Sequence, residues 1–238
     1  MSSKKIIWVT AIIGIFACCV SCTSFLPIKG NGNLVTSEKT VSEFEKINVS
    51  GSAEVRFHAS QEYRAVVTVD ENLDEYVEIV TKNNVLNIGT KSGSYSFTKF
   101  LVDIYCPILT AASVSGSGSF KNMEKITVST FETAVSGSGK IAAEVECESF
   151  SARISGSGNI MVTGNSQNAD IGISGSGKFS GDEFLIKDAT VRISGSGNVD
   201  VHVTDNLKAN ISGSGGITYR GEPKTDTNVS GSGRIKKL

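Results

Sequence analysis

Apolar and polar residues alternate through most of the chain beyond residue 110, and the tetrapeptide Ser-Gly-Ser-Gly interrupts this alternation at regular intervals. The residue before each tetrapeptide and the second residue after it are apolar in every copy, and most of them are β-branched. A two-residue period of this kind predicts strands that bury one face and meet at a corner formed by the tetrapeptide. The seven copies begin at Ser115, Ser136, Ser155, Ser174, Ser194, Ser212 and Ser230.

The corners follow one another at intervals of about 19 residues. This period is too short for a helical-pair repeat or a propeller blade, and it fits one rung of a parallel β-solenoid. We therefore predict an all-β fold, a parallel β-helix or solenoid with rungs of about 19 residues. The pattern does not choose between two and three strands per rung.

Each corner combines two glycines with two serines. Glycine supplies backbone angles closed to residues with a Cβ atom and lets successive corners stack closely. The serine hydroxyls are expected to hydrogen-bond backbone groups that the corner leaves unpaired. The alternative, a glycine-rich loop that binds an anion, is disfavoured because the tetrapeptide recurs on every rung with no helix signal after it.

Residues 40–109 show a different pattern, which predicts an irregular N-terminal part before the regular rungs of residues 110–238. An incomplete corner, Ser-Gly-Ser-Ala at residues 50–53, indicates that the solenoid starts early. A strand over residues 63–69 and a short helix that places Leu73 on its apolar face come next. A hairpin turn at residues 82–84 and a strand that stops before Pro107 complete this part.

The N-terminus has the features of an export signal. Two lysines precede an apolar run over residues 6–20, which is short for a membrane-spanning helix, and Cys22 follows. We predict a lipoprotein signal peptide over residues 1–21, lipid attachment at Cys22 and a flexible tether over residues 22–39. Residues 19–22 resemble a lipobox with Cys19 in place of the usual leucine. The alternatives are attachment at Cys18 and an ordinary signal peptide with incidental cysteines.

Charge and cysteine content limit the possible partners and indicate the state of the thiols. The formal net charge is −1, and no basic excess points to nucleic acid as a partner. After removal of the signal, Cys22, Cys106 and Cys147 would be left. We expect Cys106 and Cys147 to be two buried free thiols, although a disulfide is the alternative in an oxidising compartment.

The candidates for catalysis and metal binding are few. The chain has two histidines: His202 falls with Asp200 on the solvent side of a strand, and His58 near a strand end has a solvated or structural role. We interpret the acidic runs at residues 144–148 and 182–183 as solvent-exposed surface rather than as cation sites. The cysteine spacing offers no zinc pair and the calcium-binding nonapeptide is absent. We predict no catalytic residue, no metal ligand and no cofactor.

The order of these parts resembles the putative auto-transporter adhesin, head GIN domain family. The resemblance covers residues 40–238 and rests on the lipoprotein-like signal, the repeated corners and the phrases at residues 44–51, 85–88 and 102–107. It implies an exported, β-helical protein of the kind found in Bacteroidota. The word adhesin in the family's name is itself an inference about its members rather than a demonstrated activity.

We therefore expect a non-enzymatic, lipid-anchored protein of the cell envelope with a structural, adhesive or binding role. Its partners would be the membrane, through the anchor, and an unidentified protein or glycan. The alternatives are a β-helical enzyme acting on envelope or host glycan and a periplasmic module in envelope signalling, because fold alone does not decide function. A deep cleft with converging carboxylates would favour the enzyme, and a flat side with polar ladders would favour binding. Residues 23–27 lack the acidic side chains that often mark surface lipoproteins of Bacteroidota, which favours a periplasm-facing anchor over the cell surface.

Overall fold

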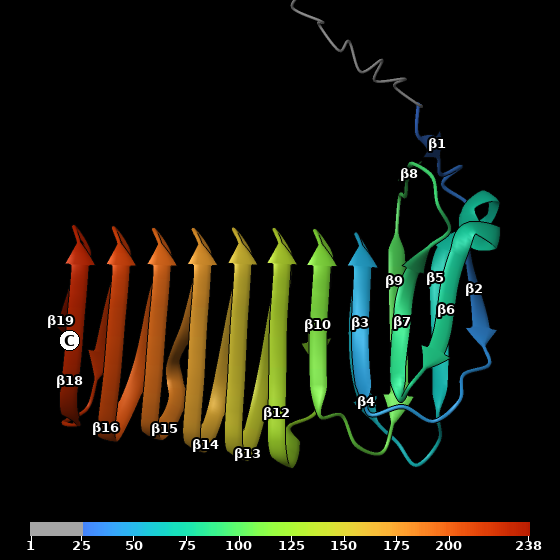
Figure 1. Ribbon diagram of the computed structural model, residues 1–238. Helices are drawn as coiled ribbons and strands as arrows, with labels where there is room; N and C mark the ends of the chain where they lie inside the picture. Colours follow the sequence, from blue (N-terminus) through green and yellow to red (C-terminus); the bar gives the residue numbers. More distant parts are fainter. Residues whose placement is uncertain (1–25) are drawn as a thin grey trace, which may run out of the picture.

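A computed structural model describes residues 26–238, and Figure 1 shows a row of parallel strands closed at one end by a group of additional strands. Each strand of the regular part pairs in parallel with the equivalent strand of the next rung, nearly residue for residue. The chain is therefore an all-β parallel solenoid, and the predicted fold class with rungs of about 19 residues is confirmed. The strands of the regular part are β10 (Ala111–Gly116), β11 (Ser119–Asn122), β12 (Ile126–Gly137), β13 (Lys140–Gly156), β14 (Asn159–Gly175), β15 (Lys178–Gly195), β16 (Asn198–Gly213), β17 (Gly216–Arg220), β18 (Lys224–Gly231) and β19 (Arg234–Lys237).

The apolar positions on either side of each corner form two continuous ladders inside the solenoid. Before the corner, Val114 pairs in register with Val49 on one side and with Val135 on the other. After the corner, Phe120 pairs with Ile141 in the same way. Each of these side chains is at most 1% exposed. Because full burial of such a side chain stabilises by about 1.5–3 kcal/mol, the stacked ladders hold the rungs together.

The corners require both of their glycines. Gly175, the last residue of β14 and the first glycine of its corner, has a φ of +119°, and a Cβ atom there would lie 2.5 Å from the carbonyl oxygen of Gly156 in the preceding rung. The second glycine, Gly177, is buried. A Cβ atom at Gly177 would lie 2.6 Å from the carbonyl oxygen of Gly158 and closer still to Cγ2 of Ile154. Only a residue without a Cβ atom lets successive corners approach this closely.

The corner backbone satisfies its own hydrogen bonds between rungs. The Ser176 amide donates to the carbonyl of Gly156 at 2.8 Å, and the Lys178 amide donates to the carbonyl of Gly158 at 3.0 Å. The expectation that serine hydroxyls would bond unpaired backbone groups is therefore wrong, because carbonyls of the preceding rung already accept from these amides. The Ser174 and Ser176 side chains are exposed instead.

A cap of further strands covers one end of the stack. The first rung consists of β3 and β4, on either side of the incomplete corner, and the chain then leaves the stack to build the cap. Here β7 and β9 pair in parallel with β3 and β4, and β6, β5 and β2 continue outward in antiparallel pairs. Figure 1 shows that β3 lies between β7 and β10, so the chain returns to the other side of its first rung. The elements of this part are β1 (Ile28–Lys29), β2 (Leu34–Lys39), β3 (Lys46–Gly51), β4 (Glu54–Ala59), β5 (Arg64–Asp70), η1 (Glu71–Tyr76), β6 (Val77–Lys82), β7 (Val85–Thr90), β8 (Tyr95–Ser96) and β9 (Phe100–Cys106).

The local predictions for the cap are confirmed. The helix expected after residue 70 is the 3₁₀-helix η1, which buries Leu73. The expected hairpin joins β6 to β7 through Asn83 and Asn84, with φ values of 52° and 62°, the left-handed geometry of a two-residue hairpin turn. Among residues 26–238, no helix has the length and apolar character that crossing a membrane would require.

The predicted flexible tether over residues 22–39 is wrong for residues 28–39. The strand β1 pairs with β8, and β2 pairs along its whole length with β5. The physical reason is that β5 would otherwise expose an unpaired edge, which β2 covers. The folded part therefore begins near residue 28 rather than residue 40, and the signal peptide with Cys22 lies outside the described residues.

Asp70 fastens this N-terminal segment to the cap. Its carboxylate accepts hydrogen bonds from the Gly32 amide at 2.9 Å and from the Thr98 amide at 2.7 Å. A side chain at Gly30 would overlap the Asp70 carboxylate. Burial alone would raise the pKa of Asp70, but hydrogen bonds from Thr98, Gly32 and Lys99 outweigh burial and lower that pKa.

Replacement of Asp70 by asparagine is expected to lower the melting temperature at neutral pH, because the amide's NH₂ group would face backbone donors. A lowered pKa in the folded state means that the ionised carboxylate stabilises the fold above its unfolded pKa of about 3.9, and that this contribution is lost as the pH falls further. The melting-temperature difference between wild type and Asp70→Asn should therefore shrink below about pH 4. The exposed Asp226→Asn serves as control, and a difference that persists unchanged to pH 2 would contradict the assignment.

Candidate functional site

A long open groove runs across the outside of the strands that lead into the corners. Side chains alternate along these strands, so the residue two positions before each corner serine and that serine itself both point outward. The groove of about 780 Å³ lies between these two columns, over the backbone of the apolar residue between them. It spans the eight rungs from β3 to β18, roughly 33 Å at about 4.8 Å per rung. One wall carries Ser115, Ser136, Ser155, Ser174, Ser194, Ser212 and Ser230, and the other Asn48, Ser113, Ala134, Arg153, Gly172, Arg192, Asn210 and Asn228.

The serine wall offers a regular row of hydroxyl groups. In the corners described above, the backbone bonds are made without the serine side chains, and the first serine of each corner is exposed. Each hydroxyl can donate one hydrogen bond and accept two. A row of such groups at one rung's spacing is the polar ladder on a flat side that favours a binding function.

Two arginines belong to the wall opposite the serines in the middle of the groove, and both donate to Asp170, which lies outside the groove lining. Arg153 Nη2 donates to Asp170 Oδ2 at 2.6 Å, and Arg192 Nη1 donates to Asp170 Oδ1 at 2.8 Å. Gly172 occupies the position between the two arginines in register, and a Cβ atom there would lie 3.1 Å from Cδ of Arg153. The missing side chain at Gly172 therefore leaves space for the Arg153 side chain to reach over β14 toward Asp170.

The sequence reading missed these arginines. Arg153, Gly172 and Arg192 each stand two residues before a corner serine, so their alignment was visible from the repeat spacing. The bridging position of Asp170 was not visible, because it depends on how two side chains bend over a glycine.

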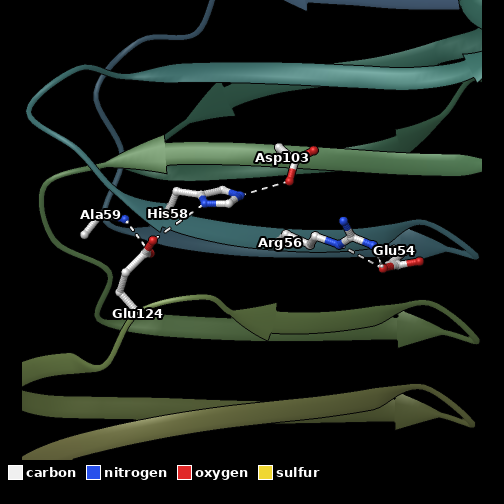
Figure 2. Close-up of polar contacts among 6 residues, drawn as sticks. All are labelled: Glu54, Arg56, His58, Ala59, Asp103 and Glu124. Carbon is white, nitrogen blue, oxygen red and sulfur yellow. Dashed lines mark hydrogen bonds and ion pairs between the residues drawn. The ribbon is translucent and has the colours of Figure 1, made fainter.

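The histidine near the cap has a structural environment (Figure 2). His58 Nε2 lies 2.9 Å from Asp103 Oδ1, and His58 Nδ1 lies 3.8 Å from Glu124 Oε1. Its ring stacks on Tyr105 with centroids 4.8 Å apart, and the Arg64 guanidinium lies over the same tyrosine at 4.2 Å. These contacts connect β4, β9 and the segment after β11, which fits the structural role expected for His58.

The remaining candidates lie apart from the groove. His202 and Asp200 face outward between buried valines of β16, as the alternation predicts. Glu144 and Glu148 are exposed, and Glu146 pairs with Lys125 at 2.7 Å. Within residues 26–238, no three His, Cys, Asp or Glu side chains gather closely enough to hold a metal ion. The groove lining contains no carboxylate.

Cys106 and Cys147 are buried free thiols, as predicted, and Cys22 lies outside the described residues. Burial raises the pKa of Cys106 to about 12, and burial also raises the pKa of Cys147. Because the thiolate is the reactive form of cysteine, neither side chain has the character of a nucleophile or a metal ligand.

We expect both thiols to resist iodoacetamide at pH 8 in the folded protein and to react after unfolding in guanidinium chloride. Peptide mapping by mass spectrometry would follow the peptides that contain Cys106 and Cys147 separately. Alkylation of both peptides in the unfolded protein serves as the control that the reagent is active. Rapid alkylation of either peptide in the folded protein would contradict the burial assigned to that cysteine.

Comparison with known proteins gives a consistent result. The family model described as "Putative auto-transporter adhesin, head GIN domain" matches residues 43–223. A crystal structure of a putative lipid binding protein from Parabacteroides distasonis is 28% identical, with a TM-score of 0.75 over 90% of this chain and 100% of that one. A putative adhesin from Parabacteroides merdae is 28% identical, with a TM-score of 0.74 over 89% of this chain and 98% of that one. A putative adhesin from Bacteroides fragilis, 21% identical, shares the fold with a TM-score of 0.83 over 89% of this chain and 100% of that one. No protein with curated information matches the chain.

Proposed function

The chain belongs to the putative auto-transporter adhesin, head GIN domain family, and from this we propose that it is a non-enzymatic, lipid-anchored binding protein of the bacterial cell envelope. The observation that carries the proposal is the groove across eight rungs, whose serine wall presents hydroxyls not used by the corner backbone. An enzyme acting on glycans would need acid and base groups around its substrate, and the groove lining has no carboxylate and no histidine.

The names of the solved relatives support a binding role. The Parabacteroides structures at 28% identity are described as a putative lipid binding protein and as a putative adhesin, and neither description is that of an enzyme. Transfer of either description to this chain is a proposal, because the fold alone does not carry function.

We further propose that Cys22 carries the lipid and that the anchor faces the periplasm. The described chain enters the fold at β1, which lies at the capped end of the solenoid (Figure 1). A lipid a few residues before β1 would attach the domain at its capped end. The groove, which runs from β3 toward the opposite end, would then extend away from the point of attachment.

A screen for binding to glycans and to extracellular-matrix proteins, run beside a cell-fractionation assay, tests the proposal. The expected result is retention of one ligand class by wild type and its loss in the variant Ser155→Gln, Ser174→Gln, Ser194→Gln, whose longer side chains would fill the groove. The matched control is Ser157→Gln, Ser176→Gln, Ser196→Gln, which changes the second serines of the same corners and leaves the groove open. Shortening of a glycan by the wild-type protein, or the absence of any ligand, would overturn the proposal.

A further inference from the structure

The groove carries positive charge without negative charge in its lining. Arg153 and Arg192 are its only charged lining residues within the described part of the chain, and their side chains are 50% and 58% exposed. Asp170 bonds to both arginines from outside the lining and neutralises one of the two charges. The middle of the groove therefore retains one unbalanced positive charge.

The two guanidinium groups still have donors to offer. A guanidinium group has five N–H donors in a planar fork that matches a carboxylate. Arg192 directs one of them to Asp170 in this structure, while Arg153 bonds to Asp170 and to the carbonyls of Ala152 and Asp170. Arg192 is thus the principal free donor, and Arg153 helps to hold the shared carboxylate in place.

The shape of the groove selects an extended ligand. Its length of roughly 33 Å at about 4.8 Å per rung exceeds what a compact small molecule would fill. The serine hydroxyls repeat at nearly the advance of one sugar in an extended polysaccharide, and sugar hydroxyls are suitable partners for them. A single-stranded nucleic acid would stack its bases on aromatic side chains, and the groove lining has none. An extended peptide would add to an exposed strand edge or dock in an aromatic-lined groove, and this groove crosses a sheet face and has no aromatic side chain in its lining.

From these observations we propose that the groove binds a linear polyuronate, an acidic polysaccharide whose carboxylates pair with Arg192 and Arg153 while its hydroxyls contact the serine wall. The inference rests on the proposed binding function and adds its ligand class and its site. Asp170 then acts as an internal competitor, because it occupies donors that a uronate carboxylate would otherwise receive.

Binding of alginate oligosaccharides, measured by isothermal titration calorimetry at two salt concentrations, tests the inference. Arg153→Gln combined with Arg192→Gln should weaken binding at least tenfold and reduce its salt dependence. Asp170→Asn should strengthen binding, because it frees arginine donors and removes the competing negative charge. Neutral dextran oligosaccharides should bind far more weakly than alginate to the wild-type protein.

The matched control is Lys121→Gln combined with Lys140→Gln, two exposed lysines outside the groove lining. It removes the same charge from the surface, so an equal loss of alginate binding in this control would overturn the inference in favour of unspecific attraction. Alginate binding unaffected by the arginine changes would also overturn it. If alginate fails to bind while the wider screen finds a ligand that depends on the serine wall, the polyuronate inference falls and the proposed binding function stands.

Discussion

Gly175→Val is expected to lower the free energy of unfolding by at least about 1–3 kcal/mol, the cost of one residue held in a sparsely populated backbone conformation. Gly175 has a φ of +119°, and a Cβ atom there would meet the carbonyl oxygen of Gly156 at 2.5 Å. That carbonyl accepts the hydrogen bond of Ser176, so it has little freedom to move. The valine therefore strains its own backbone and also separates two rungs. Urea unfolding followed by circular dichroism would measure the loss.

Ser176→Ala provides the matched control in the same corner. Its side chain is exposed, and the corner backbone bonds do not involve its hydroxyl, so we expect a change within about 0.5 kcal/mol. A wild-type unfolding midpoint for Gly175→Val would show that the corner tolerates a side chain. An equal loss in both variants would instead show that the serine has a structural role that the backbone bonds do not reveal.

The regular rungs could be predicted from the sequence because their pattern is local and repeated. Val114 and Val135 occupy equivalent positions in their repeats, so stacking the repeats places them together without knowledge of the intervening chain. The glycines follow the same logic, since every corner after the one at Ser115 meets an identical corner in the rung before it. In a repeat protein, the spacing of a short motif is therefore enough to predict which residues of neighbouring rungs are in contact.

The cap could not be predicted in the same way. Its order depends on pairs such as Lys46 with Val85 and Ala65 with Ile104, which lie far apart in the sequence and belong to no repeat. The incomplete corner at residues 50–53 indicated a first rung, but no periodic signal showed that the cap and β10 pack on opposite sides of β3. The strand β2 was mistaken for tether because its stability comes from the edge of β5 and from the anchoring of the preceding segment by Asp70.

The candidate site could be predicted from the sequence only in part. The row of serines was evident, but the role first given to their hydroxyls was wrong, because the backbone bonds between rungs become visible only in three dimensions. The alignment of Arg153 with Arg192 follows from repeat spacing, whereas their shared contact with Asp170 depends on the missing side chain at Gly172. Sequence periodicity places residues on a surface, and side-chain geometry decides which of them act together.

Cys22→Ala is expected to abolish lipid attachment and to release the protein from the membrane fraction or leave its precursor uncleaved. The thiol of Cys22 would be the point of attachment, since it follows a lysine-led apolar segment and stands a few residues before the folded part, which starts at β1. Metabolic labelling with a fatty-acid analogue, followed by fractionation of cells, would measure both effects. The control is Cys18→Ala, which should retain label and membrane association. Loss of label in Cys18→Ala with full label in Cys22→Ala would move the anchor to Cys18, and label in neither wild type nor variants would support an ordinary signal peptide.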